Sequence, residues 1–455
     1  MQVAGRNSAT MESASIDFHL SEESIRSAIA NLNEDVEFKA TTSSIGNQVN
    51  LAIQVSDFKT ATCFEVTAGR ICIANPGSEP QFILKAQPEH WQQFFAPVPK
   101  RPFQTFWGMI RVLGRPAGVE VLGDQDAFTK HARTWRIVLD RIREAVNGRQ
   151  ASLSQREEYT SEDETDDDSI IGHYTWLTLP PLGKCKIFYE ISGQGSQPIL
   201  FLHTAGSDSR QYHSIMLNKD LQTKYKMYAF DLPGHGRSFP GEKQYPLSYA
   251  NSEDFYISCI RSFLDKLSIR RSIVTGASMG GQVCLAVALR AKELDVRGVI
   301  PCEACDFIPS AAGSSIYSLQ GDEAILNAER VCGMISPTSP EIYKRLNWWL
   351  YSAQASRIFP GDLKFYFDGW DGRQRMHLVD TEECPIYMLT GEYDYSCSVE
   401  MSRATAEKIQ GGEKGSYVVF EAMDGLGHFP FSEDPVRFMP YFKRALEFIA
   451  AKSRA

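Results

Sequence analysis

Apolar residues follow two different patterns along the chain. In the first part, short runs alternate apolar and polar positions between Gly, Asn and Pro, whereas the second part alternates near-continuous apolar runs with amphipathic stretches. Period-two alternation is typical of half-buried strands, and continuous apolar runs between helices are typical of a parallel sheet covered on both faces. The pattern therefore predicts a small α+β unit followed by a larger α/β unit.

The first unit, residues 15–147, is predicted to begin with a helix. Ser21 and the acids after it cap an apolar pattern at helical spacing. Strands are predicted over VEFKA, NQVNLAIQV, ATCFEVTAG and RICIANPG, a helix after Pro88, and one long amphipathic helix over residues 126–146. No catalytic group stands out in this unit.

An acidic segment separates the two units. The sequence EEYTSEDETDDD, residues 157–168, cannot bury apolar area, so we predict a disordered linker over residues 148–171.

The second unit, residues 172–455, alternates predicted strands and helices. The strands are CKIFYEI, PILFLH, KMYAFDL, RSIVTG, RGVIPCEA, CPIYMLTG and GSYVVFEA. The stretch from about 306 to 381 interrupts this order with helical patterns and many aromatic residues. We predict that it is a lid inserted into the α/β unit.

Composition restricts the partners of the protein. The net charge of -9 argues against a nucleic-acid partner, because binding phosphates needs a basic face. No apolar run reaches the roughly 18 residues of a membrane-spanning helix. The ten cysteines, Cys302 and Cys305 included, do not form the paired spacing of a zinc site, so we predict neither metal nor cofactor.

Reduced thiols and the absence of a signal-like N-terminus favour the cytoplasm. A peroxisomal location is unsupported, because the C-terminal Ser-Arg-Ala departs from that signal.

Reactive side chains follow three of the predicted strands. Ser278 follows RSIVTG within the stretch GASMG, Asp394 follows CPIYMLTG, and His428 follows GSYVVFEA. The carboxyl ends of parallel strands form the ligand-binding edge of such a sheet, so we expect the three groups in one site. A serine hydroxyl needs a base to become a nucleophile, and the imidazole base needs an acid to orient it.

These motifs resemble those of the α/β-hydrolase superfamily over about 280 residues. The matching stretches are HTAG, DLPGHGRS, GASMGG, GEYD and GHFP, in the chain order Ser, Asp, His. The resemblance implies an α/β-hydrolase fold with a mostly parallel sheet, helices on both faces and a helical lid. It also implies that Ser278 is the nucleophile, His428 the base and Asp394 the acid. Glu303 is the alternative acid, because some members, such as the fungal lactone hydrolases that open zearalenone, carry their acid after the preceding strand.

An oxyanion hole needs two backbone N–H groups aimed at the developing charge. The resemblance assigns one to Met279, after the nucleophile, and the other to the loop after His203. Ala205 is the expected donor there and Thr204 the alternative, because this chain has His-Thr where the family usually has His-Gly.

The substrate is expected to lie between these groups and the lid. Candidate contacts are His203, Arg210, Trp348, Trp349, Tyr351 and Trp370, although aromatic residues of a lid also pack it onto the core. We expect a serine-dependent hydrolase of an ester or lactone of an apolar, aromatic or polyketide-like small molecule. The SMGG sequence also resembles carbon–carbon hydrolases, which use the same triad on diketones. A non-catalytic protein that binds a hydrophobic ligand is a further alternative.

The first unit resembles a sterol-carrier-type lipid-binding fold. The likeness rests on the order helix, hairpins and then FILKAQPEHW, and it implies a hydrophobic ligand. Phe103, Phe106 and Trp107 would line a lipid tunnel or form a core. The other interpretation is a packing or dimerisation domain, which would make the protein a homodimer.

Overall fold

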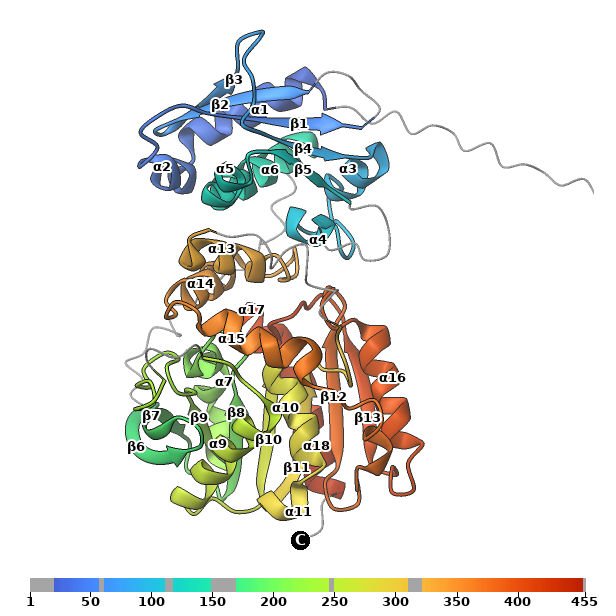
Figure 1. Cartoon of the computed structure of the whole chain (residues 1–455). Coiled ribbons are helices and arrows are strands. Elements are labelled where there is room, and N and C mark those ends of the chain that lie inside the picture. Colours follow the sequence, from blue (N-terminus) through green and yellow to red (C-terminus); the bar gives the residue numbers. More distant parts are fainter. Residues whose placement is uncertain are drawn as a thin grey trace, which may run out of the picture.

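Two sheets organise the chain, as Figure 1 shows. The computed structural model describes residues 20–56, 61–110, 118–148, 169–244, 249–309 and 321–452. Most of the predicted linker, residues 149–168, and the C-terminal Ser-Arg-Ala lie outside the described residues. Among the helices that are described, none combines the length and the apolar character needed to cross a membrane.

The N-terminal unit has a five-stranded sheet in the order β3-β2-β1-β4-β5. β1 pairs with β4 in parallel and with β2 antiparallel, and the remaining pairs are antiparallel. The elements are α1 (Glu22–Glu34), α2 (Val36–Thr42), β1 (Val49–Val55), β2 (Thr62–Thr67), β3 (Arg70–Ile73), β4 (Phe82–Ala86), α3 (Pro88–Phe94), α4 (Phe106–Ile110), β5 (Glu120–Gly123), α5 (Gln125–Lys130) and α6 (Ala132–Val146). Helices and sheet enclose one hydrophobic core, in which Phe106, Trp107 and Phe128 pack ring to ring. The smaller α+β unit is thus present.

Two predictions for this unit are wrong. VEFKA is not a strand but belongs to α2, because the Asp35 side chain caps the helix at the Phe38 N–H, and Phe38 and Thr42 then bury one face at i and i+4. The single helix predicted over residues 126–146 is two helices, α5 and α6, divided at His131, whose backbone leaves the helical conformation (φ -106°, ψ 20°).

The C-terminal sheet has eight strands in the order β13-β12-β11-β10-β8-β9-β7-β6. The strands are β6 (Ile171–Leu179), β7 (Gly183–Ser192), β8 (Gln197–Leu202), β9 (Tyr225–Phe230), β10 (Ser272–Ala277), β11 (Val296–Cys302), β12 (Ile386–Gly391) and β13 (Val418–Met423). From β9 to β13 all neighbours are parallel, and β7 and β6 extend the sheet antiparallel. The predicted mostly parallel sheet is confirmed. β6 was not predicted, because the first half of this strand is exposed and lacks an apolar alternation.

Helices cover both faces of this sheet. The helices of the α/β unit are α7 (His213–Met216), α8 (Lys219–Lys224), α9 (Glu253–Lys266), α10 (Met279–Ala288), α11 (Ala291–Leu294), α16 (Val399–Gln410), α17 (Pro430–Glu433) and α18 (Pro435–Lys452), with a 3₁₀ turn η1 (Ser209–Tyr212). α9 and α10 pack into one hydrophobic cluster with the sheet, and α18 packs into a second. The layers are those of an α/β fold with a buried sheet.

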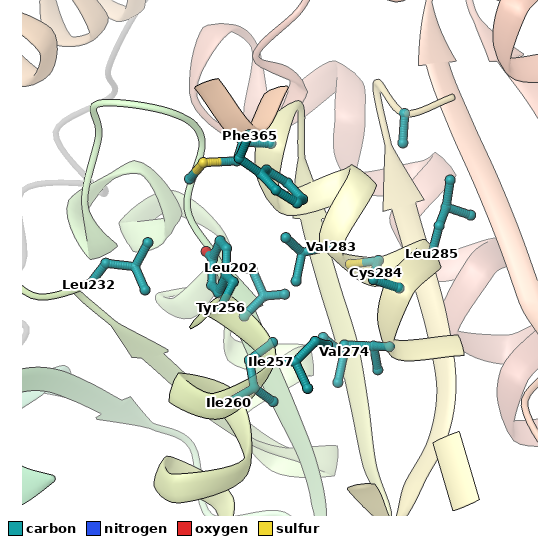
Figure 2. Packing of buried hydrophobic residues seen from close by; sticks show 14 of the residues in the cluster. Leu202, Leu232, Tyr256, Ile257, Ile260, Val274, Val283, Cys284, Leu285 and Phe365 are labelled. Atoms are coloured by element: carbon teal, nitrogen blue, oxygen red, sulfur yellow. The ribbon is translucent and has the colours of Figure 1, made fainter. Parts of the chain in front are cut away.

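A helical segment between β11 and β12 covers the carboxyl edge of the sheet. It contains α13 (Glu323–Cys332), α14 (Glu341–Ser352), α15 (Ile358–Lys364), η3 (Phe365–Gly369) and η4 (Met376–Leu378), which we call the lid. Figure 2 shows Phe365 of the lid over Val283 of α10, in the same cluster as Leu202 at the end of β8. The lid is therefore packed onto the core.

The N-terminal unit rests on the lid, beside α13 and α14 (Figure 1). Leu326 of α13 belongs to the hydrophobic core of the N-terminal unit. Arg136 of α6 forms an ion pair of 2.9 Å with the fully buried Glu329 of α13. The contact between the two parts is thus both apolar and charged.

Candidate active site

Ser278 stands on the turn between β10 and α10, in a conformation that serine rarely adopts. Its φ is 58° and ψ is -121°. Gly276 and Gly280 make the turn possible, because a Cβ on either would lie 2.5 or 2.1 Å from the carbonyl oxygen of Leu202. The strained turn lifts Ser278 to the N-terminus of α10, where the helix dipole favours negative charge. The local sequence GASMG thus places the hydroxyl at the carboxyl edge of the sheet.

His428 and Asp394 form a buried pair. His428 Nδ1 lies 2.7 Å from Asp394 Oδ2, and both side chains are almost inaccessible. Asp394 Oδ1 accepts hydrogen bonds from the N–H groups of Ser396 and Cys397. Burial alone would raise the pKa of Asp394, but the neighbouring imidazole and these donors hold this pKa below its usual value. The carboxylate can therefore stay ionised and orient the ring.

Glu303 lies behind Asp394 and not against the imidazole. It follows β11 with a positive φ of 51°, and both of its carboxyl oxygens accept the Gly391 N–H, at 3.0 and 3.1 Å. Complete burial and the charge of Asp394 raise the pKa of Glu303 well above its usual range. The side-chain hydrogen bond between Glu303 and Asp394 acts in the same direction on Glu303 and lowers the pKa of Asp394.

In the loop after β8, the N–H groups on either side of Ala205 are engaged. The Thr204 N–H donates to Gln211 Oε1, and the Gly206 N–H donates to Asp362 Oδ2 on the lid. Among the hydrogen bonds of the described residues, none has the N–H of Ala205 or of Met279 as its donor. Thr204 is thus already engaged, which leaves Ala205 as the loop N–H that a ligand can use.

Ser278 and His428 line the same small pocket. Its volume is about 20 Å³, room for one water molecule. In the part of the chain that the structure describes, no hydrogen bond joins Ser278 Oγ to His428. The bond between a nucleophile and its base is often long or poorly aligned in structures without substrate. The other lining residues are Thr204, Ala205, Val331, Met334, Tyr351, Phe359, Leu363, Tyr366, Ser396 and Phe429. The lid is closed over the site.

Comparisons with known proteins identify the family of the C-terminal unit. The family model described as the alpha/beta hydrolase family matches residues 199–440. The chain belongs to the α/β-hydrolase family.

Relatives of this α/β-hydrolase include proteins with and without a described activity. An uncharacterised protein of Mycobacterium tuberculosis is 27% identical over 283 residues, which are 57% of this chain and 77% of that protein. The sn-1-specific diacylglycerol lipase of Danio rerio is 31% identical over 117 residues, 25% of this chain and 35% of the lipase. An esterase of Thermogutta terrifontis has the same fold, with a TM-score of 0.52 and 17% identity over 61% of this chain and 99% of the esterase.

Several expected substrate contacts of the hydrolase lie outside the pocket. His203 is buried, with its ring nitrogens bonded to the Thr204 carbonyl and the Leu232 N–H, and burial lowers its pKa to about 4. Arg210 is paired with Asp208 and stacks on the exposed Trp349. These groups support the loop after β8.

The lid aromatics divide between three environments. Tyr351 lines the pocket, with its hydroxyl bonded to Thr204 Oγ1. Trp370 is buried and donates to the carbonyl of Cys305, while Trp348 faces the N-terminal unit and stacks with Arg133. Other residues that line the pocket were not predicted from the sequence, because they belong to no chemical motif. They are chiefly Val331, Met334, Phe359, Leu363, Ser396 and Phe429.

Glu303, Asp394 and His428 also lie close enough to hold a metal ion, with ligand atoms within 4.8 Å of one another. The atoms that a metal would need are engaged, however. His428 Nδ1 and Asp394 Oδ2 bond to each other, and both carboxyl oxygens of Glu303 accept the Gly391 N–H. The donor set suits proton transfer better than metal coordination.

Proposed function

We propose that the protein is a serine hydrolase that cleaves esters or lactones of apolar small molecules. Ser278 attacks the carbonyl, His428 takes the proton from Ser278 and returns it to the leaving group, and Asp394 orients His428. The N–H groups of Ala205 and Met279 bind the oxyanion. Water then releases the acyl group. The observation that carries the proposal is that His428, bonded to Asp394, lines one pocket with Ser278.

The lining of the pocket supports an apolar acyl group. Val331, Met334, Phe359, Leu363 and Phe429 surround the reacting side chains. The diacylglycerol lipase among the relatives also acts on an acyl ester, as its name states. A carbon–carbon hydrolase would need the same triad, so an ester panel and a β-diketone panel assayed in parallel separate the two reactions.

A fluorophosphonate probe tests the proposal. We expect the wild-type protein to be labelled at Ser278, as located by peptide mass spectrometry, and to hydrolyse p-nitrophenyl esters. Ser278→Ala should lose labelling and turnover while its melting temperature stays close to that of the wild type. Ser258→Ala, on α9 and outside the pocket, is the control. An unlabelled wild-type protein would favour a non-catalytic binding protein.

A further inference from the structure

A loop of the N-terminal unit, residues 101–107, contacts the segment that carries Asp394. Gln104 Nε2 donates a hydrogen bond of 2.7 Å to the carbonyl oxygen of Tyr393, and Arg101 Nη1 donates one of 3.4 Å to that of Asp394 itself. Arg101 also contacts both carboxylate oxygens of Glu400 on α16. The backbone that bears the proposed acid is therefore held by side chains 289 and 293 positions earlier in the chain.

The same loop contacts the segment that holds His428. Thr105 Oγ1 donates a hydrogen bond of 2.9 Å to the carbonyl oxygen of Gly333. The next residue, Met334, accepts the backbone N–H of His428 at 3.2 Å. Trp107 packs so closely on Gly333 that a Cβ there would lie 2.8 Å from the Trp107 Cβ. One loop thus reaches both the acid and the base.

The loop is also anchored within the N-terminal unit. Gln104 is 2% exposed, and its carbonyl oxygen accepts a hydrogen bond from Arg143 Nη2 on α6. Arg143 Nε donates in turn to the carbonyl of Phe94 at the end of α3. Gln104 is thus held at its side-chain Nε2 and at its backbone carbonyl, so it links the backbone of Tyr393 to α6.

The neighbouring surfaces of the two units form a cavity. It has a volume of about 250 Å³, and both Gln104 and Thr105 line it. Arg133, Arg136 and Arg143 of α6 line this cavity and not the pocket that Ser278 and His428 line. The loop is accordingly the part of the N-terminal unit placed to act on the triad.

We propose that Gln104, with Arg101 and Thr105, positions Asp394 and His428 for the reaction, so that the N-terminal unit is a working part of the active site. The inference rests on the proposed serine mechanism. A misplacement of about 1 Å can cost on the order of 10²-fold in rate, so a loosened acid segment should lower turnover without removing any reacting group. A separate carrier or dimerisation domain would not have this effect.

The test uses full-length variants that delete single contacts. Gln104→Met keeps the length of the side chain and removes the amide, and Thr105→Val keeps the shape and removes the hydroxyl. Arg101→Gln changes a side chain that is 27% exposed, so it should fold even if Gln104→Met does not. Asn147→Ala is the control, because Asn147 Nδ2 also bonds a backbone carbonyl, that of Phe95, but within the N-terminal unit.

We expect kcat for a short p-nitrophenyl ester to fall roughly 10- to 100-fold in the Gln104 variant, with KM changed less than about two-fold. The downfield proton resonance between His428 and Asp394 should broaden or shift. Arg101→Gln and Thr105→Val should show the same effects more weakly. Asn147→Ala should keep kcat and the resonance, even if its melting temperature falls.

The outcomes separate the two proposals. A wild-type protein that fluorophosphonate does not label overturns the serine mechanism. A labelled wild-type protein whose three loop variants retain kcat and the resonance overturns the positioning role alone. The positioning role is also overturned if Asn147→Ala loses as much turnover as the loop variants. The loss would then reflect a general decrease in the stability of the N-terminal unit.

Discussion

Asp362 on the lid accepts a 2.8 Å hydrogen bond from the backbone N–H of Gly206, beside Ala205. The same carboxylate oxygen lies 2.8 Å from Nε2 of His235, and the other oxygen accepts from Tyr249 and Asn251. All these groups are buried. A single lid carboxylate therefore ties the lid to the core and holds the loop that presents the proposed oxyanion donor.

Replacing Asp362 should affect the reaction as well as the lid. In Asp362→Asn the amide cannot accept all four hydrogen bonds, so the loop after β8 should lose its fixed position. We expect kcat for p-nitrophenyl esters to fall by about 10²-fold, comparable with the loss of one oxyanion donor. Asp371→Asn, in the lid segment but exposed and ion-paired with Arg373, should keep wild-type turnover. Equal turnover in both variants would refute the link between lid and loop.

The His235–Asp362 pair should make stability depend on pH. Burial alone would lower the pKa of His235, but the charge of Asp362 raises this pKa above 6.5. Burial alone would raise the pKa of Asp362, but the charge of His235 keeps this pKa below 3.8. The stabilisation by protonated His235 is complete below its unfolded pKa, and it disappears as pH rises through the raised value. The stabilisation due to ionised Asp362 is lost only as the pH falls through the lowered pKa of this group, in strong acid.

Melting temperatures at pH values from about 6 to 9 test this pair. The gap between the wild-type protein and Asp362→Asn should narrow toward alkaline pH. A gap that stays constant, or that widens, would show that the pair does not titrate in this range.

Asp394 and Glu303 should respond differently to loss of charge. Asp394→Asn removes the acceptor of His428 Nδ1 and should lower kcat by about 10⁴-fold. Glu303→Gln keeps an uncharged side chain, the form that burial favours by raising the pKa of Glu303, so we expect a loss below about tenfold. Steady-state kinetics on one ester with both variants decides between the two carboxyl groups. The reverse order of effects would make Glu303 the acid.

Leu363 should limit the size of the acyl group. It lies on α15 and lines the closed pocket. Leu363→Ala should raise kcat/KM for octanoyl over acetyl p-nitrophenyl esters by about tenfold, because buried methylene groups contribute roughly 1 kcal/mol each to discrimination. Leu378→Ala, on the exposed η4 turn of the lid segment, is the control and should leave the ratio unchanged. An unchanged ratio in the Leu363 variant would place the acyl group elsewhere.

Local sequence was sufficient for most elements and for the core of the candidate site. The GASMG turn, the order Ser, Asp, His and the near-continuous apolar strands are short-range features, and an α/β sheet brings its strand ends to one edge whatever the loops contain. The sequence therefore predicts that Ser278, Asp394 and His428 lie at one edge of the sheet, and in the structure Asp394 bonds His428, which lines one pocket with Ser278. The errors of the sequence prediction were also local. Asp35 caps a helix where the residue pattern indicated a strand, and the exposed first half of β6 carries no periodic signal.

Only the tertiary structure decided which groups surround these three residues. Glu303 and Asp394 both follow strands, and their order around the imidazole depends on how β11 and β12 pair, not on spacing along the chain. Three further contacts join segments that are far apart in sequence. Leu363 of the lid lines the pocket of Ser278, Asp362 accepts the Gly206 N–H, and Gln104 donates to the Tyr393 carbonyl. Such contacts arise from the packing of whole units, and no periodicity or motif within either partner encodes them.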